Sequence, residues 1–188
     1  MGLVSCNSQK IQLNSLKNCL DKKDISTLEK GLLNFETLLA EKYTKLQKEE
    51  SYIQFLNDFS NYKISPDFFL DSDSKKIRAE IRGFGIWQFF EESDEEMEAE
   101  IRLDGSQSEN SLEILTLKSE FQNCLITEVS SKGIKNALEI RTKVPNLSLG
   151  LTAKSIHDGI NKGDLKNAMD RLVIAYVIYY EFALNLEK

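Results

Sequence analysis

Apolar residues recur every three or four positions through most of this chain, which is the spacing of one buried face of a helix. The first long example begins at Ser26-Thr27-Leu28-Glu29, which has the form of a capping box at a helix start. The apolar positions on its face are Leu28, Leu32, Phe35, Leu39, Tyr43 and Leu46. We expect a helix from about Ser26, a continuation through Tyr52–Phe59 after a break near Glu49, and an end before Pro66.

Helical spacing also dominates the rest of the chain outside its middle. Short helices are expected at 11–20, around 77–84, at 119–129, at 134–141 and from Ser148 to Ile160. The last helix is expected to begin at Asp164, and it is apolar on every side from Leu172 to Tyr180. A helix that is apolar all round belongs inside a core, so this segment is predicted to be the buried spine of the domain.

The middle of the chain follows a period of two. Apolar and charged residues alternate in Met97–Leu103, and alternation returns in Leu112–Leu117 after the turn-rich stretch 104–110. Such alternation on both sides of a polar loop predicts a β-hairpin. We therefore expect a mainly α fold: a tether at 1–10, then a single-domain helical bundle over 11–188 with a small β-hairpin near 97–117. The alternative is an α+β fold with a larger antiparallel meander from 75 to 144, because residues 138–144 also alternate.

The charge balance narrows the classes of partner. The 188 residues include 24 Lys and Arg against 30 Asp and Glu, for a net charge of −6. Nucleic-acid binding depends on clustered basic residues, and the sequence has no such cluster, so no nucleic-acid partner is expected. Acidic residues gather instead in 91–100, where seven of ten positions are Asp or Glu. This run is either a solvated loop or an arm that steers a basic protein partner.

Large apolar residues directly precede the acidic run. Phe84, Ile86, Trp87, Phe89 and Phe90 belong either to the core or, for an exposed subset, to a hot-spot patch beside the acidic charges. The candidate partner-binding residues are Trp87, Phe89, Phe90, Glu91, Glu92, Asp94, Glu95 and Glu96.

Residues that could carry out catalysis are few. His157 is the single histidine, which excludes a histidine cluster around a metal, and neither a metal nor a cofactor is expected. Cys19 and Cys124 either form a disulfide in an oxidising compartment or remain separate thiols on their apolar stripes. A thiol of either residue paired with His157 would make the protein a hydrolase, which we keep as an alternative.

The first residues indicate a location. Leu3-Val4-Ser5-Cys6 has the form of a bacterial lipobox, in which the chain is cut before the cysteine and Cys6 carries the lipid. Because a signal peptide needs roughly 7–15 apolar residues before the cut, we expect the true start to lie upstream of Met1. One alternative is an acylated Met1-Gly2 start with Cys6 as a second lipid site. The other is an unmodified terminus and a cytoplasmic protein.

Several segments together resemble a family. They are 144–153 (VPNLSLGLTA), Asp164-Leu165, Tyr179–Leu184, Phe121–Leu125 and Ile86-Trp87. Over most of its length the chain is similar to small, mostly helical bacterial lipoproteins of unknown function, and it differs from them in the acidic stretch before Met97. The resemblance implies an α-rich fold and a lipid anchor, and it assigns no catalytic residue.

Three functions follow from these observations. The first, which we favour, is a lipid-anchored protein of the bacterial envelope that acts by protein–protein interaction, for example as an immunity or inhibitor protein. The second is a hydrolase of the cell wall or of lipids. The third is a structural or assembly subunit of an envelope complex.

Overall fold

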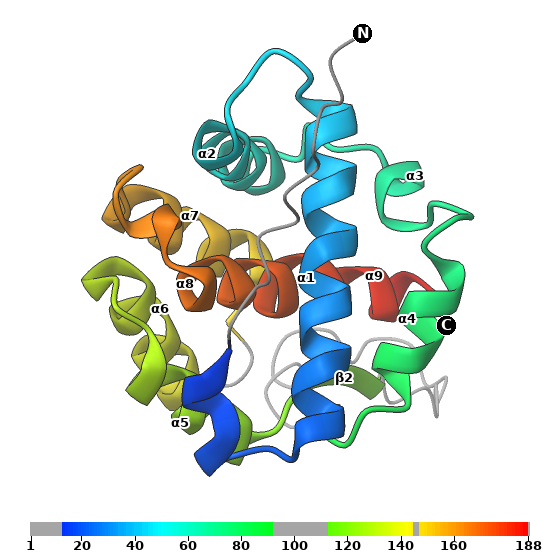
Figure 1. The fold of residues 1–188 in the computed structure, drawn as a ribbon. Coiled ribbons are helices and arrows are strands. Elements are labelled where there is room, and N and C mark those ends of the chain that lie inside the picture. The colour runs from blue at the N-terminus through cyan, green and yellow to red at the C-terminus, as the bar shows by residue number, and fades with distance from the viewer. Residues whose placement is uncertain (1–12, 92–112, 145–146, 188) are drawn as a thin grey trace, which may run out of the picture.

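The structure, a computed structural model, describes residues 13–91, 113–144 and 147–187. It is mostly helical with a small two-stranded antiparallel sheet, as predicted. In chain order the elements are η1 (Asn14–Asn18), α1 (Lys22–Lys42), α2 (Lys48–Ser60), α3 (Pro66–Phe69), α4 (Lys75–Arg82), β1 (Trp87–Glu91), β2 (Glu113–Leu117), α5 (Ser119–Glu128), α6 (Lys132–Lys143), α7 (Leu149–Gly159), η3 (Asp164–Lys166), α8 (Ala168–Val173), η4 (Ile174–Tyr180, a π-helix) and α9 (Glu181–Leu186). Figure 1 shows α1 crossing the helix formed by α8 and α9, with the other helices around them.

The C-terminal helix forms the centre of the core. α8, η4 and α9 follow one another without interruption, and every side chain from Leu172 to Tyr180 is fully buried. This confirms the predicted spine, although it begins later than Asp164. Asn167 caps α8 by accepting the Met169 N–H at 2.8 Å, whereas Asp164 accepts the Asn161 N–H at 3.0 Å in the preceding turn.

α1 packs its predicted face against this spine but starts earlier than predicted. Asp21 accepts the Asp24 N–H at 2.8 Å and caps the helix, so Ser26 lies inside it and has no capping role. The break before α2 also comes earlier, and Gln47 and Glu50 form the reciprocal capping box there. The apolar spacing therefore located the buried face correctly from Leu28 to Leu39, whereas the cap at Ser26 was wrong and Leu46, 40% exposed, lies in the break between the helices.

The helices expected between 119 and 160 are confirmed as α5, α6 and α7. α7 begins where the predicted helix from Ser148 does, and Ser148 caps it by accepting the Leu151 N–H at 3.3 Å. The alternative of an antiparallel meander from 75 to 144 is wrong, because α4, α5 and α6 occupy most of that range.

β1 and β2 form the sheet, with Trp87 opposite Leu117 and Phe89 opposite Leu115. The strand predicted at 112–117 is confirmed as β2, and it pairs with β1. The other strand of the predicted hairpin, at 97–103, lies outside the described residues. Trp87 and Leu117 are both buried, so this pairing closes an apolar face over the core. Because side chains alternate between the faces of a strand, Ile114 lies on the opposite face from Phe89 and Leu115.

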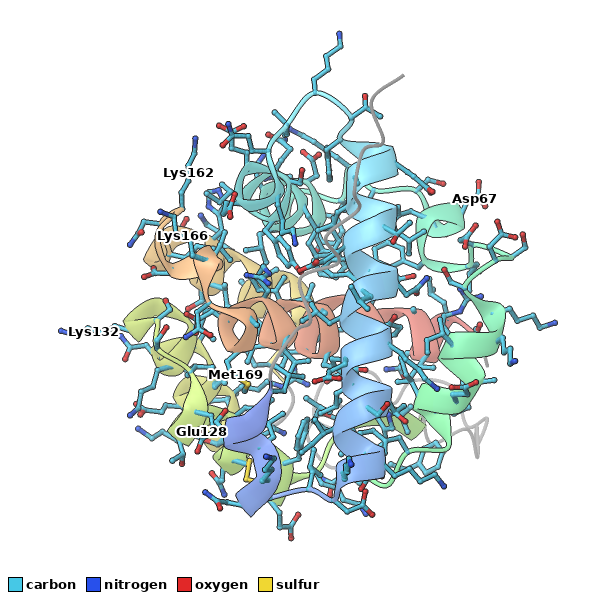
Figure 2. All side chains as sticks on the ribbon, viewed as in Figure 1. Asp67, Glu128, Lys132, Lys162, Lys166 and Met169 are labelled. Carbon is cyan, nitrogen blue, oxygen red and sulfur yellow. A yellow bond between two sulfur atoms is a disulfide. The ribbon has the colours of Figure 1, made fainter. Side chains whose placement is uncertain are left out.

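A disulfide joins the N-terminal turn to the body of the domain. Cys19, just after η1, is bonded to Cys124 of α5, with the two Cα atoms 6.3 Å apart. Leu13 and Leu16 beside it are buried in the core. Figure 2 shows the bond in yellow at the lower end of the molecule, near the label of Glu128. Of the two alternatives that the sequence left open, the structure has the disulfide.

The described helices share one cluster of buried apolar side chains. Within 13–91, 113–144 and 147–187, no helix combines the length and the apolar character needed to cross a bilayer. The predicted tether, with Cys6, lies outside these residues.

Candidate functional site

The predicted partner-binding residues separate in the structure. Trp87 is only 7% exposed, and its indole N–H donates to the Ile81 carbonyl at 2.8 Å, so it belongs to the core and not to an exposed patch. Phe89, two residues later on β1, is 60% exposed. The side chains of Phe90 and Glu91, and the residues Glu92, Asp94, Glu95 and Glu96, lie outside what the structure describes.

The disulfide also decides the question of a cysteine nucleophile. Cys19 and Cys124 are bonded to each other, so neither offers a free thiol to His157. His157 lies near the end of α7, with Nδ1 3.2 Å from a carboxylate oxygen of the neighbouring Asp158. Among the described residues, no three His, Cys, Asp or Glu side chains gather as metal ligands would.

A groove of about 550 Å³ opens where α2, α3, α7, α9 and β2 meet. This volume is in the range of sites that bind small molecules. The groove's lining residues are Phe59, Tyr62, Ile64, Pro66, Phe69, Ile114, Ser148, Leu149, Gly150, Phe182 and Asn185. None of these described residues is charged, in a chain of which 29% is charged, and we call this feature the aromatic groove.

Three phenylalanine rings form the base of the aromatic groove. The ring of Phe182 lies 4.6 Å from that of Phe69 and 5.1 Å from that of Phe59, and both pairs meet edge to face. Tyr179 of the spine stacks on Phe69 from inside the core, and burial raises the pKa of its hydroxyl to about 12. The base is therefore a rigid, uncharged aromatic surface.

Two of the polar side chains in the lining, Asn185 and Ser148, hydrogen-bond to the backbone, and the third polar group is the Tyr62 hydroxyl. The Asn185 amide oxygen accepts the Leu115 N–H, and its nitrogen donates to the carbonyls of Leu115 and Glu181, each at 2.8 Å. The Ser148 hydroxyl oxygen caps α7. The Asn185 amide thus bonds both the N–H and the C=O of Leu115, on the edge of β2 that faces away from β1.

Tyr62 stands at the rim in an unusual backbone conformation. Its φ is +55°, and its side chain is 88% exposed. The Tyr62 N–H donates to Phe59 O at 3.1 Å, and the Lys63 N–H donates to Asp58 O at 2.8 Å. These two bonds form a Schellman motif at the end of α2, in which the left-handed position is usually glycine. A tyrosine there is strained, and the strain brings no burial in return.

Sequence reasoning missed the aromatic groove. Its residues come from four helices, one strand and the turn after α2, so no local pattern in the sequence brings them together. One local signal was present: Asn61-Tyr62-Lys63 follows a helix without the glycine or asparagine expected at the left-handed position.

We compared the chain with known protein families, curated proteins and solved structures. Neither a protein-family model, nor a curated protein, nor a solved structure gives a significant match.

Proposed function

We propose that this protein is a lipid-anchored protein of the bacterial envelope that acts by binding a protein partner. The observation that carries the proposal is the Cys19–Cys124 disulfide. Disulfides form and persist in oxidising compartments and are rare in the cytosol. A disulfide-bonded domain therefore agrees with the lipobox form of Leu3-Val4-Ser5-Cys6, in which Cys6 would carry the lipid.

Phe89 supports the binding role. It is the one candidate aromatic whose side chain is described as exposed, and it lies on the strand that leads into the acidic run 91–100. An exposed aromatic ring beside charges of one sign suits a partner with a basic rim around an apolar pocket. An immunity or inhibitor protein that masks a toxin is a specific form of this proposal, and a toxin gene beside this one would favour it.

The location is tested by intact mass. The protein is expressed in its native host from the full upstream reading frame, and membrane and soluble fractions are compared. A membrane-bound chain that begins at a lipidated Cys6 is the expected result. A soluble chain that retains Met1 would contradict the anchor.

The binding role is tested by capture from envelope extract with the Phe89→Ala variant. The matched control is Leu33→Ala, because Leu33 is also an exposed apolar residue, at 50%, but lies on α1 and not on the strand of Phe89. Loss of an anchoring aromatic at a hot spot weakens binding by about 2 kcal/mol or more, so capture of the basic partner should fall for Phe89→Ala only. Equal capture by both variants would remove Phe89 from the binding surface. A second variant, with the acidic residues of 91–100 changed to Gln, should weaken capture and reduce its salt dependence.

A further inference from the structure

We propose that the aromatic groove binds a single acyl chain, with the hydrocarbon lying in the groove and the polar head group outside it at Tyr62. This site is independent of Phe89, because Ile114, which lines the groove, lies on the opposite face of the sheet. The inference therefore adds a ligand site to the protein, and it does not depend on the identity of a protein partner.

The chemistry of the lining selects hydrocarbon. The described lining has no charged side chain, and its one amide, Asn185, is held by three hydrogen bonds. A polar or charged group placed at the base would lose its hydrogen bonds to water without replacement. A chain of methylene groups loses nothing of this kind and gains from leaving water.

The same contacts disfavour a peptide added as a strand. An extended peptide binds a sheet edge through the free N–H and C=O groups of that edge. On β2 both groups of Leu115 are already bonded to Asn185, so this part of the edge next to the groove is closed. Recognition at the base of the groove must therefore come from apolar contact, which an acyl chain supplies along its whole length.

Tyr62 marks the open end of the site. Its ring lines the groove, while its exposed hydroxyl lies 3.6 Å from the position that a Cβ at Gly150 would occupy. The residue has a φ of +55°, at the turn that ends α2 beside the groove. A phenol has an apolar ring and a hydroxyl that donates a hydrogen bond, so it suits the junction between a hydrocarbon chain and a carboxylate or ester.

The first experiment is a fluorescence titration with cis-parinaric acid, a fatty acid that becomes fluorescent in apolar surroundings. The protein is the full chain with Cys6→Ser, so that no lipid of its own competes. We expect saturable binding that is displaced by saturated fatty acids. Each added methylene from C8 to C12 should tighten displacement by roughly fourfold, the factor that corresponds to burying one CH₂. Binding that is not saturable, or that does not depend on chain length, would overturn the proposal.

Gly150 and Gly85 allow a matched pair of variants. A Cβ at Gly150 meets only the Tyr62 hydroxyl, at 3.6 Å, and the Tyr62 Cζ atom, at 4.0 Å, so a side chain can start there without a clash. Gly150→Phe places a ring at the mouth of the groove, at an α7 position where any residue other than proline favours helix more than glycine does. Gly85→Phe is the control, because Gly85 is exposed, has open space around its Cβ position and does not line the groove. We expect Gly85→Phe to bind like the parent and Gly150→Phe to bind about tenfold more weakly, a loss of about 1.4 kcal/mol. Equal binding by the two variants would place the fatty acid elsewhere and overturn the proposal.

The acyl chain could come from a bilayer phospholipid or from a free fatty acid, and a second experiment distinguishes these two sources. The protein is incubated with phosphatidylethanolamine–phosphatidylglycerol vesicles and re-isolated, and its lipid is extracted and weighed by mass spectrometry. Bound phospholipid identifies the bilayer as the source, and fatty-acid binding without phospholipid identifies free fatty acid; either result supports an acyl-chain site. Binding of an amphipathic apolar peptide with no binding of fatty acid or phospholipid would show that the groove serves a protein instead.

Discussion

The hydroxyl of Tyr176 lies against the backbone of α1 at Gly31, in space that a side chain at position 31 would fill. A Cβ there would collide with the Tyr176 oxygen and would come within 2.8 Å of Ile81 Cδ1. Tyr180 contacts the same residue through its backbone, since its hydroxyl donates to the Gly31 carbonyl at 2.8 Å. At Gly31, α1 therefore lies close against the buried spine.

The first prediction is that Gly31→Ala lowers the free energy of unfolding by about 1–3 kcal/mol, the usual cost of overpacking a core. Helix propensity alone would favour alanine over glycine by about 1 kcal/mol, so a lower free energy of unfolding indicates overpacking and a higher one indicates helix propensity. Urea denaturation measures the free energy of unfolding, and Gly150→Ala, which has room for its methyl group, is the control. A Gly31→Ala protein as stable as the parent would show that Tyr176 moves aside freely.

The second prediction concerns the buried ion pair of Arg141 and Glu181. Both side chains are 3% exposed, they bond to each other, and Arg141 also donates to Thr116 Oγ1 at 2.9 Å. Glu181→Leu should cost about 3–5 kcal/mol, because it leaves an unpaired guanidinium that cannot lose its proton. The double variant with Arg141→Leu should recover most of this loss. Urea denaturation of the two single variants and the double variant completes the cycle, and simple additivity would contradict the coupling.

The same pair gives a dependence on pH. Burial raises the pKa of Glu181 above 4.5 in the folded protein, and Arg141 opposes this rise. In Arg141→Leu the opposing charge is gone, so the folded state retains a proton that the unfolded chain releases above about pH 4.5. The stability of this variant should therefore be greatest near pH 4.5 and fall as the pH rises. Denaturation midpoints from pH 4.5 to 8, compared with those of the parent, measure the effect; a rise with pH would contradict it.

The third prediction concerns the disulfide. Cys19 and Cys124 are 105 residues apart, and a bond that closes so long a loop restricts the unfolded chain strongly. Reduction, or replacement of both cysteines by serine, should lower the free energy of unfolding by roughly 2–5 kcal/mol. The helical circular dichroism at 25 °C should be retained, because Leu13 and Leu16 still bury their side chains against the core. Alkylation without reductant, followed by mass measurement, tests the bond itself: two labelled thiols at these positions would contradict it.

The fourth prediction is that Tyr62 strengthens binding of the acyl chain and lowers the stability of the folded protein. Tyr62→Ala removes the ring and keeps a residue that resists a φ of +55°, whereas Tyr62→Gly removes the ring and the strain together. Tyr62→Gly should be more stable than Tyr62→Ala by about 1 kcal/mol, the cost of the left-handed conformation. Both variants should bind cis-parinaric acid more weakly than the parent. Equal stability of the two would mean that the turn relaxes, and undiminished binding would remove Tyr62 from the acyl-chain site.

Much of the fold could be predicted because helix formation leaves local marks. The periodic face of α1, the start of α7 at Ser148 and the all-apolar stretch from Leu172 to Tyr180 each depend on residues within a few turns of one another. The start of α1 was predicted about a turn too late, because the capping-box form at Ser26 lies close to Asp21, which caps the helix in the structure. The strand at 113–117 was also predicted, but its pairing with Trp87–Glu91 was not, because pairing is a choice between distant segments.

The sequence by itself determined which stretches are helical, which of their faces are buried, and that the chain is acidic and has a lipobox-like start. Only the tertiary structure decided that Trp87 is buried while Phe89 is exposed, that Cys19 meets Cys124, and that three phenylalanines from different helices form one groove. The physical reason is that periodicity reports which way a side chain points from its own helix. What it meets there depends on how the helices cross, which brings together residues as distant in sequence as Gly31 and Tyr176.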